Sequence, residues 1–164
     1  MILIHLGHHN ILNLTSCILL LLHEGFKVQE LQEAVKKILM VKRRQELRGT
    51  YKETLVIDDF AHHPRAIKET IMAMKEKYSD KKMITVFEPI SATARSSHFQ
   101  EEFLESLAFS DKIIIAKSSL PTTALNHENL DVKKLVKELT LKGKEAREVS
   151  KLMDLRDTID SFLE

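Results

Sequence analysis

The fold of this chain is decided by the stretch Val56-Ile57-Asp58-Asp59-Phe60-Ala61-His62-His63-Pro64. A short apolar run, typical of a strand, ends there in two carboxylates and two imidazoles. Pro64 suits the first position of a helix, because proline lacks the N–H group that the first helical turn leaves unpaired. Ligands of open parallel sheets bind outside the carboxyl ends of the strands. The stretch therefore predicts a candidate ligand site, although Asp-rich strand ends are equally typical of plain helix caps.

The chain alternates between strand-like and helix-like patterns from residue 54 onward. Continuous apolar runs predict strands buried on both faces, with a weaker strand last, at residues 55–57, 83–87, 113–116 and 147–149. Amphipathic helices are predicted around Ile67, Phe103, Leu135 and Ile159. This order predicts an α/β fold with a Rossmann-like, mostly parallel sheet, flanking helices and right-handed crossovers.

Residues 1–43 do not fit the alternation. They predict one helix from Asn10 to about Glu24, closed by Gly25, and a second helix with apolar residues from Val28 to Leu39. Two helices without strands of their own are too little for a domain. We therefore expect residues 1–43 to be the end of another domain, and residues 44–164 to form the α/β domain.

Composition narrows the class of protein. The chain has 164 residues, a net charge of +1 and no tryptophan, which gives no reason to expect a nucleic-acid partner. The run from Ile11 to Leu22 is too short to span a bilayer and has no basic segment before it, so we expect a buried helix and no membrane insertion. The single cysteine, Cys17, reads as a core thiol in a reducing compartment, the cytoplasm.

Three connections are expected to share the carboxyl edge of the sheet, at residues 58–64, 88–97 and 117–123. Their carboxylates, imidazoles, hydroxyls and cations suit a phosphate-bearing or polyhydroxylated ligand, and come from Asp58, Asp59, His62, His63, Glu88, Ser91, Thr93, Arg95 and Lys117. Zinc is not favoured, because the adjacent histidines of the pairs 8–9 and 62–63 cannot face one point and no thiolate accompanies them. A general base and a histidine that only orders the loop both remain open.

The sequence has no phosphate-binding loop of the form G-x-x-x-x-G-K-[ST] and only four glycines. The basic cluster Lys42-Arg43-Arg44 fits a solvated patch. Its place between two sequence patterns also fits an arginine that reaches a phosphate lying between domains.

Three motifs together resemble the Mur ligases of bacterial peptidoglycan synthesis. Residues 7–13 resemble the family's G-x-H-N-x-x-N helix, residues 41–46 its V-K-R-R-x-E junction, and residues 58–64 its D-D-[FY]-[AG]-H-H-P strand end. Phe60-Ala61 and Phe87-Glu88-Pro89 are more similar to the tripeptide-recycling branch of the family. The L-alanine-adding branch usually carries Tyr-Gly and Gln-Pro-His-Arg at these places.

The resemblance implies an ATP- and Mg²⁺-dependent amide ligase that joins UDP-N-acetylmuramate to the peptide L-Ala-γ-D-Glu-meso-diaminopimelate. The alternatives are ligation of L-alanine and a non-catalytic module that binds a nucleotide or a partner. Nucleotide-binding roles are implied for Asn10, Asn13, Arg44, Asp59 and His62. Substrate-binding roles are implied for the loop residues Ser91, Thr93 and Arg95.

Several departures from the family pattern accompany this resemblance. The glycine-rich ATP loop, the modified lysine and the magnesium-binding acid are absent, so we expect a fragment that lacks the N-terminal and central domains and is inactive alone. The family's terminal strand is also missing after Glu164. Ile90 and Ala92 stand where the recycling ligases usually carry arginine and asparagine.

Overall fold

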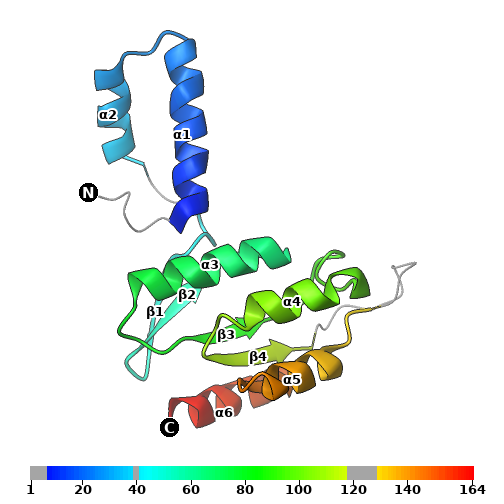
Figure 1. Ribbon diagram of the computed structural model, residues 1–164. Helices are drawn as coiled ribbons and strands as arrows, with labels where there is room; N and C mark the ends of the chain where they lie inside the picture. Colours follow the sequence, from blue (N-terminus) through cyan, green and yellow to red (C-terminus); the bar gives the residue numbers. More distant parts are fainter. Residues whose placement is uncertain (1–6, 39–40, 118–128) are drawn as a thin grey trace.

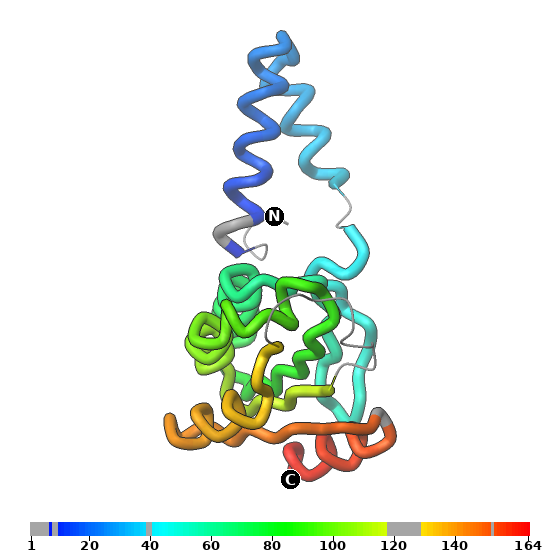
Figure 2. Tube along the Cα trace, turned by 90° about the vertical axis from the view of Figure 1, so that its right-hand side faces the viewer, coloured from blue at the N-terminus to red at the C-terminus, as the bar shows by residue number. Residues whose placement is uncertain are grey.

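The computed structural model describes residues 7–38, 41–117 and 129–164, without the side chains of His8, His9 and Leu152 (Figure 1). It has two parts. A helical hairpin is formed by α1 (Gly7–His23) and α2 (Val28–Lys36), and an α/β body follows from residue 46. The hairpin projects from one side of the body, and the C-terminus lies at the opposite end (Figure 2).

The helical hairpin has the two helices that the sequence predicts, and Gly25, at φ 93°, follows α1 where a left-handed residue is required. Leu31 of α2 is buried. The prediction of a buried α1 with Cys17 in a core is wrong: Cys17 is exposed, and so are Leu12, Leu19 and Leu20. In the described part of the chain, α1 lies beside α2 and contacts α3 at its lower end, and much of its remaining apolar surface is exposed.

The body contains two separate sheets. Strands β3 (Ile84–Phe87), β4 (Lys112–Ala116) and β5 (Glu145–Val149) are parallel and lie in that order, which confirms the predicted parallel α/β sheet. The strand that carries the opening stretch, β2 (Thr54–Asp58), pairs instead with β1 (Glu46–Tyr51) in an antiparallel hairpin. The expectation that β2 belongs to the parallel sheet is therefore wrong for the described residues.

Strand β1 was not predicted because its sequence, Glu-Leu-Arg-Gly-Thr-Tyr, has no apolar run and Leu47 is exposed. The turn that joins it to β2 places Lys52 and Glu53 at φ 45° and 64°. Positive φ at both central residues is the conformation of the tight turns that match the twist of a hairpin. The usual Asn-Gly signal for such a turn is absent here.

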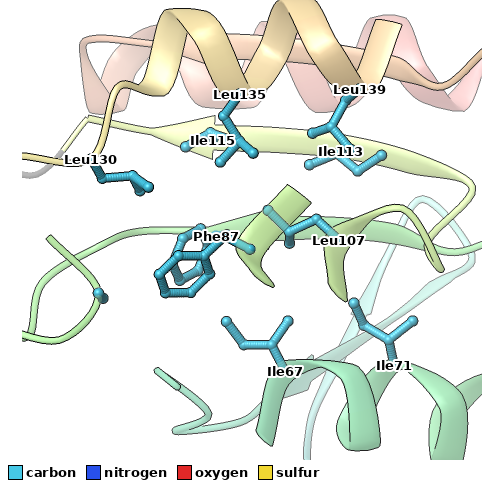
Figure 3. Close-up of a cluster of buried hydrophobic side chains, with 11 residues drawn as sticks. Ile67, Ile71, Phe87, Leu107, Ile113, Ile115, Leu130, Leu135 and Leu139 are labelled. Carbon is cyan, nitrogen blue, oxygen red and sulfur yellow. The ribbon is translucent and has the colours of Figure 1, made fainter. Parts of the chain in front are cut away.

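Helices cover the parallel sheet on both faces. Helices α3 (Pro64–Lys77), α4 (Gln100–Leu107) and α5 (Val132–Leu141) share one apolar cluster with β3 and β4, and α6 (Leu152–Leu163) packs on the other face (Figure 3). Side chains alternate across a strand, so Ile113 and Ile115 face the first group while Ile114 faces α6. Only β4 is buried on both faces as predicted. Val56 and Val86 are 44% and 45% exposed, because α6 packs mainly on β4 and β5 and, of β3, only Ile84 joins its cluster among the described residues.

Helix α6 also ties the β1–β2 hairpin to the rest of the body. The Asp160 carboxylate accepts a hydrogen bond from the Tyr51 hydroxyl at 2.9 Å and pairs with the Lys52 ammonium at 2.9 Å. These bonds, that of Lys52 first, lower the pKa of Asp160. Further along the helix, the Lys112 ammonium donates to the Phe162 carbonyl at 2.7 Å. One helix thus contacts both sheets.

Candidate functional site

The carboxylate of Asp59 lies at the end of β2 and is half-buried. Its Oδ2 accepts a hydrogen bond from the Gln45 amide at 2.9 Å, and its Oδ1 accepts from the Ala61 amide at 2.8 Å and the Thr70 hydroxyl at 3.4 Å. An ionised carboxylate offers about four lone-pair positions. Three are used by the protein, which leaves room for about one further donor.

The two histidines of the opening stretch have different roles. His63 is the N-cap of α3, where its Nδ1 accepts from the Arg65 amide at 3.3 Å, and Pro64 takes the first helical position as predicted. His62 is exposed, and its Nδ1 donates to the Phe60 carbonyl at 3.0 Å. The Nδ1 bond thus orders the His62 ring within its loop. The Nε2 atom is not part of that bond and can donate to or accept from a ligand.

The link between the helical hairpin and the body is a tight turn, Lys42 to Gln45, which we call the joint. Arg43 and Gln45 adopt φ values of 57° and 50°, in the left-handed region that non-glycine residues rarely occupy. The Phe60 amide donates to the Arg43 carbonyl at 2.8 Å, and the Arg43 amide donates to Glu46 Oε2 at 2.8 Å. The second bond is the main reason that the pKa of Glu46 is lowered.

The side chain of Arg43 also returns to the strand end. Its guanidinium lies 5.0 Å from the centre of the Phe60 ring, and its Nε lies 3.7 Å from Asp58 Oδ2. Arg44, between the two left-handed residues, is exposed. The structure therefore brings Asp59, His62 and the joint that carries Arg44 into one cluster.

The loop after β3 is folded on itself. Ser91 Oγ accepts from the Ala94 amide at 3.0 Å, and the Ser91 carbonyl accepts from the Arg95 amide at 3.0 Å. The Arg95 carbonyl accepts from the Leu130 amide at 2.8 Å, which attaches this loop to the start of the α5 segment. The predicted substrate residues Ser91, Thr93 and Arg95 are all half-buried.

Two of the three predicted connections meet. The ring of His63 packs edge-on against that of Phe99, 5.1 Å between centres, in the short 3-10 turn η2 (Ser97–Phe99) that follows the β3 loop. The third connection lies outside the described residues apart from Lys117. The other predicted nucleotide residues, Asn10 and Asn13, lie in the first turns of α1.

Sequence reasoning missed Gln45 and Thr70 as partners of Asp59. Gln45 contributes a backbone amide, which leaves no signal in side-chain type, and Thr70 lies nearly two helical turns inside α3. Within the described ranges no group of three or more His, Cys, Asp or Glu side chains is placed to hold a metal ion. No helix in that part of the chain is long and apolar enough to cross a membrane.

A groove of about 470 Å³ separates β2 from β3. Residues of both strands line it along their length, and Ile67, Ile71 and Met74 of α3 form its apolar floor. Asp59 and Ala61, which follow β2, also line the groove. Lys81 and Lys82, which precede β3, contribute cationic side chains to its lining. The groove runs between two strands that, in the described part of the chain, are not paired with each other.

These features define an α/β domain in which a polar cluster at the end of β2 lies beside the joint to the helical hairpin. Residues 43–164 match the family model described as Mur ligase, glutamate ligase domain. The chain therefore belongs to the Mur ligase family. The match begins inside the joint.

Relatives with established names cover most of this chain. It is 36% identical to the UDP-N-acetylmuramate–L-alanine ligase of Lactobacillus delbrueckii subsp. bulgaricus over 68% of this chain and 25% of that protein. The corresponding ligase of Streptococcus pneumoniae is 31% identical over 96% of this chain and 35% of that protein. The chain thus spans about a third or less of the length of these relatives.

Two solved structures are similar over nearly the whole chain. The UDP-N-acetylmuramate–alanine ligase of Thermotoga maritima has a TM-score of 0.71 at 27% identity, covering 92% of this chain and 31% of that one. A murein peptide ligase of Psychrobacter arcticus has a TM-score of 0.66 at 28% identity, covering 93% and 31%.

Proposed function

We propose that this chain is the carboxy-terminal part of an ATP- and Mg²⁺-dependent, cytoplasmic ligase that acts on UDP-N-acetylmuramate. The observation that carries the proposal is the family match over residues 43–164, together with relatives whose names specify that substrate. In the proposed reaction ATP phosphorylates the muramate carboxylate, and the acceptor amine then displaces phosphate from the acyl phosphate. Mg²⁺ and the phosphate loop would be supplied by the N-terminal and central parts of the parent protein.

We propose the same domain division that the sequence suggests. Residues 1–43 would close the central ATPase domain, and residues 44–164 would form the carboxy-terminal domain. The exposed apolar surface of α1 supports this, since such a surface is typical of an interface with another domain. The start of the family match at residue 43 supports it independently.

The proposed nucleotide residues are Asn10, Asn13, Arg44, Asp59 and His62. Asp59 would accept a ribose hydroxyl at its remaining lone pair, and exposed Arg44 would face the phosphates. Arg44→Ala in the parent ligase should lower kcat/KM for ATP roughly tenfold to a hundredfold, the worth of one hydrogen bond to a charged group. Arg48→Ala, an exposed arginine paired with Glu46 at 3.2 Å, is the matched control and should change kcat/KM little.

The activity itself is tested with the parent protein. Release of inorganic phosphate should require UDP-N-acetylmuramate, ATP and an acceptor together. The 164-residue chain alone should show no ATP turnover, because phosphoryl transfer depends on a phosphate cradle and metal ions that its described residues do not supply. A parent protein that binds a nucleotide but never releases phosphate would favour the non-catalytic module instead.

Two acceptors compete. The tripeptide is favoured by Phe60-Ala61 and Phe87-Glu88-Pro89, and L-alanine by the names of the matched ligases. Phosphate release with each acceptor decides between them. Ile90, which is exposed, cannot bind a carboxylate, so Ile90→Arg with Ala92→Asn should raise kcat/KM for the tripeptide relative to L-alanine. Ile90→Leu with Ala92→Ser is the matched control.

We also propose that one further strand of the parent protein lies in the groove between β2 and β3. Within the described ranges, neither strand has a ladder partner on the side facing the groove. A parallel strand there would join the two sheets. Amide exchange in β2 and β3 should then be slower in the parent protein than in this chain, while β4, already paired on both sides, should not change.

A further inference from the structure

The joint is held in an unfavourable backbone conformation. Two of its residues, Arg43 and Gln45, are left-handed without being glycine. Such residues persist only where surrounding contacts over-determine them. The contacts that do so here come from Glu46 of β1 and from the end of β2, where the Asp59 carboxylate accepts from Gln45.

Asp59 connects three segments. It accepts from the joint at Gln45, from its own strand end at Ala61 and from α3 at Thr70. Because the joint bond uses Oδ2 and the others use Oδ1, the carboxylate bridges the joint and the body with its two oxygens. No single neutral acceptor can replace both.

We propose that Asp59 is a positioning residue that fixes the conformation of the joint. Through the joint it would also fix the direction in which the Arg44 side chain projects. Two bonds that Asp59 does not make, from the Phe60 amide to the Arg43 carbonyl and from the Arg43 amide to Glu46, depend on the joint keeping this shape. Weakening of these two bonds when Asp59 is changed would therefore indicate a positioning role. The importance of the direction of Arg44 rests on the proposed nucleotide function. The stabilisation of the joint by Asp59 does not rest on it.

The experiment is amide hydrogen exchange by NMR on the full 164-residue chain. In Asp59→Asn, which keeps the size but not both acceptors, the amides of Gln45, Phe60 and Arg43 should exchange roughly tenfold faster or more, as loss of a hydrogen bond to a charged group implies. The Ile114 amide in the fully buried β4 should be unchanged. Asp58→Asn, the neighbouring carboxylate 3.7 Å from Arg43 Nε, is the matched control and should leave these amides as they were.

The proposal is overturned if only Gln45 and Ala61 respond, because Asp59 would then be a local cap. It is also overturned if no amide responds. If Asp59→Asn accelerates Ile114 as well, the double variant Asp59→Asn with Gln45→Gly decides. Glycine adopts positive φ without strain, so the joint should keep its conformation with fewer stabilising contacts. The protection of the Phe60 amide from hydrogen exchange should then be partly restored. Absence of that rescue overturns the proposal, and none of these outcomes depends on nucleotide binding.

Discussion

The helical hairpin and the α/β body use apolar residues in opposite ways. The hairpin buries Leu31 but exposes Leu12, Leu19 and Leu20, whereas the body buries Leu107, Leu135 and Leu139 completely. Both parts are rich in leucine and isoleucine. Composition therefore does not separate them; what separates them is whether the surrounding chain offers a second surface to pack against.

This difference indicates that the body carries the stability of the chain. Its helices α3, α4 and α5 converge on one cluster with the parallel sheet, so each apolar side chain contacts several elements (Figure 3). The helical hairpin is two helices lying side by side (Figure 1), with one end of α1 in contact with α3. Loss of an apolar side chain should therefore have very different costs in the two parts.

The largest expected effect comes from a matched pair of leucines in helices. Leu135→Ala in α5 should lower the free energy of unfolding by about 2–5 kcal/mol, through lost burial and the cavity left behind. Leu20→Ala in α1 should change it by less than about 0.5 kcal/mol, because Leu20 is 60% exposed. Urea unfolding followed by circular dichroism measures both. Equal costs would show that the hairpin is as well packed as the body.

A smaller effect is expected at helix caps. Asp131 is the N-cap of α5, and its carboxylate accepts from the Lys134 amide at 2.9 Å. Lys27, at the start of α2, makes no side-chain cap bond. Asp131→Ala should cost about 1 kcal/mol of unfolding free energy, and Lys27→Ala much less. Similar losses in the same urea assay would mean that α2 is capped by a contact with its lysine.

The smallest effect concerns pH. Burial raises the pKa of Asp111, but hydrogen bonds from the Lys75 ammonium at 2.7 Å and the Met83 amide at 2.8 Å outweigh it, so the pKa lies below its ordinary value. The folded state therefore binds the proton less tightly than the unfolded chain. The stabilisation is complete above the ordinary pKa and is lost as the pH falls through the lowered one.

Asp111→Asn should accordingly lower the free energy of unfolding at pH 6 by under about 1 kcal/mol, since the pair is partly exposed. The difference from the unchanged protein should shrink below about pH 4. Urea midpoints at the two pH values measure it. Glu105→Gln, exposed on α4, is the control, and a deficit of Asp111→Asn that grew in acid would contradict the assignment.

Much of the body could be predicted from the sequence because its signals are local. The apolar run of β4, the Pro64 helix start and the helical spacing around Leu135 each depend on a few neighbouring residues. The pairing of β2 with β1 could not be predicted in this way, because β1 is polar and its turn lacks glycine.

The site was predicted in part for the same reason. The polar strand end with Asp59 and His62 is visible in residue types. The hold of Asp59 on the joint is made by a backbone amide 14 residues away, which no residue type reveals. The exposure of Cys17 was missed because an apolar helix looks the same in sequence whether or not another surface covers it.

The contact between Tyr51 and Asp160 joins residues 109 positions apart and sets an order for folding. The β1–β2 hairpin closes early, since its strands are adjacent in the chain, and the end of β2 is bonded to α3 at Thr70, but the contact with α6 can form only when the last helix is made. During synthesis from the N-terminus, the first two strands leave the ribosome long before α6. Closing so long a loop is slow compared with local pairing. Nearly the whole domain must therefore be synthesised before its first strands gain their contacts with the last helix.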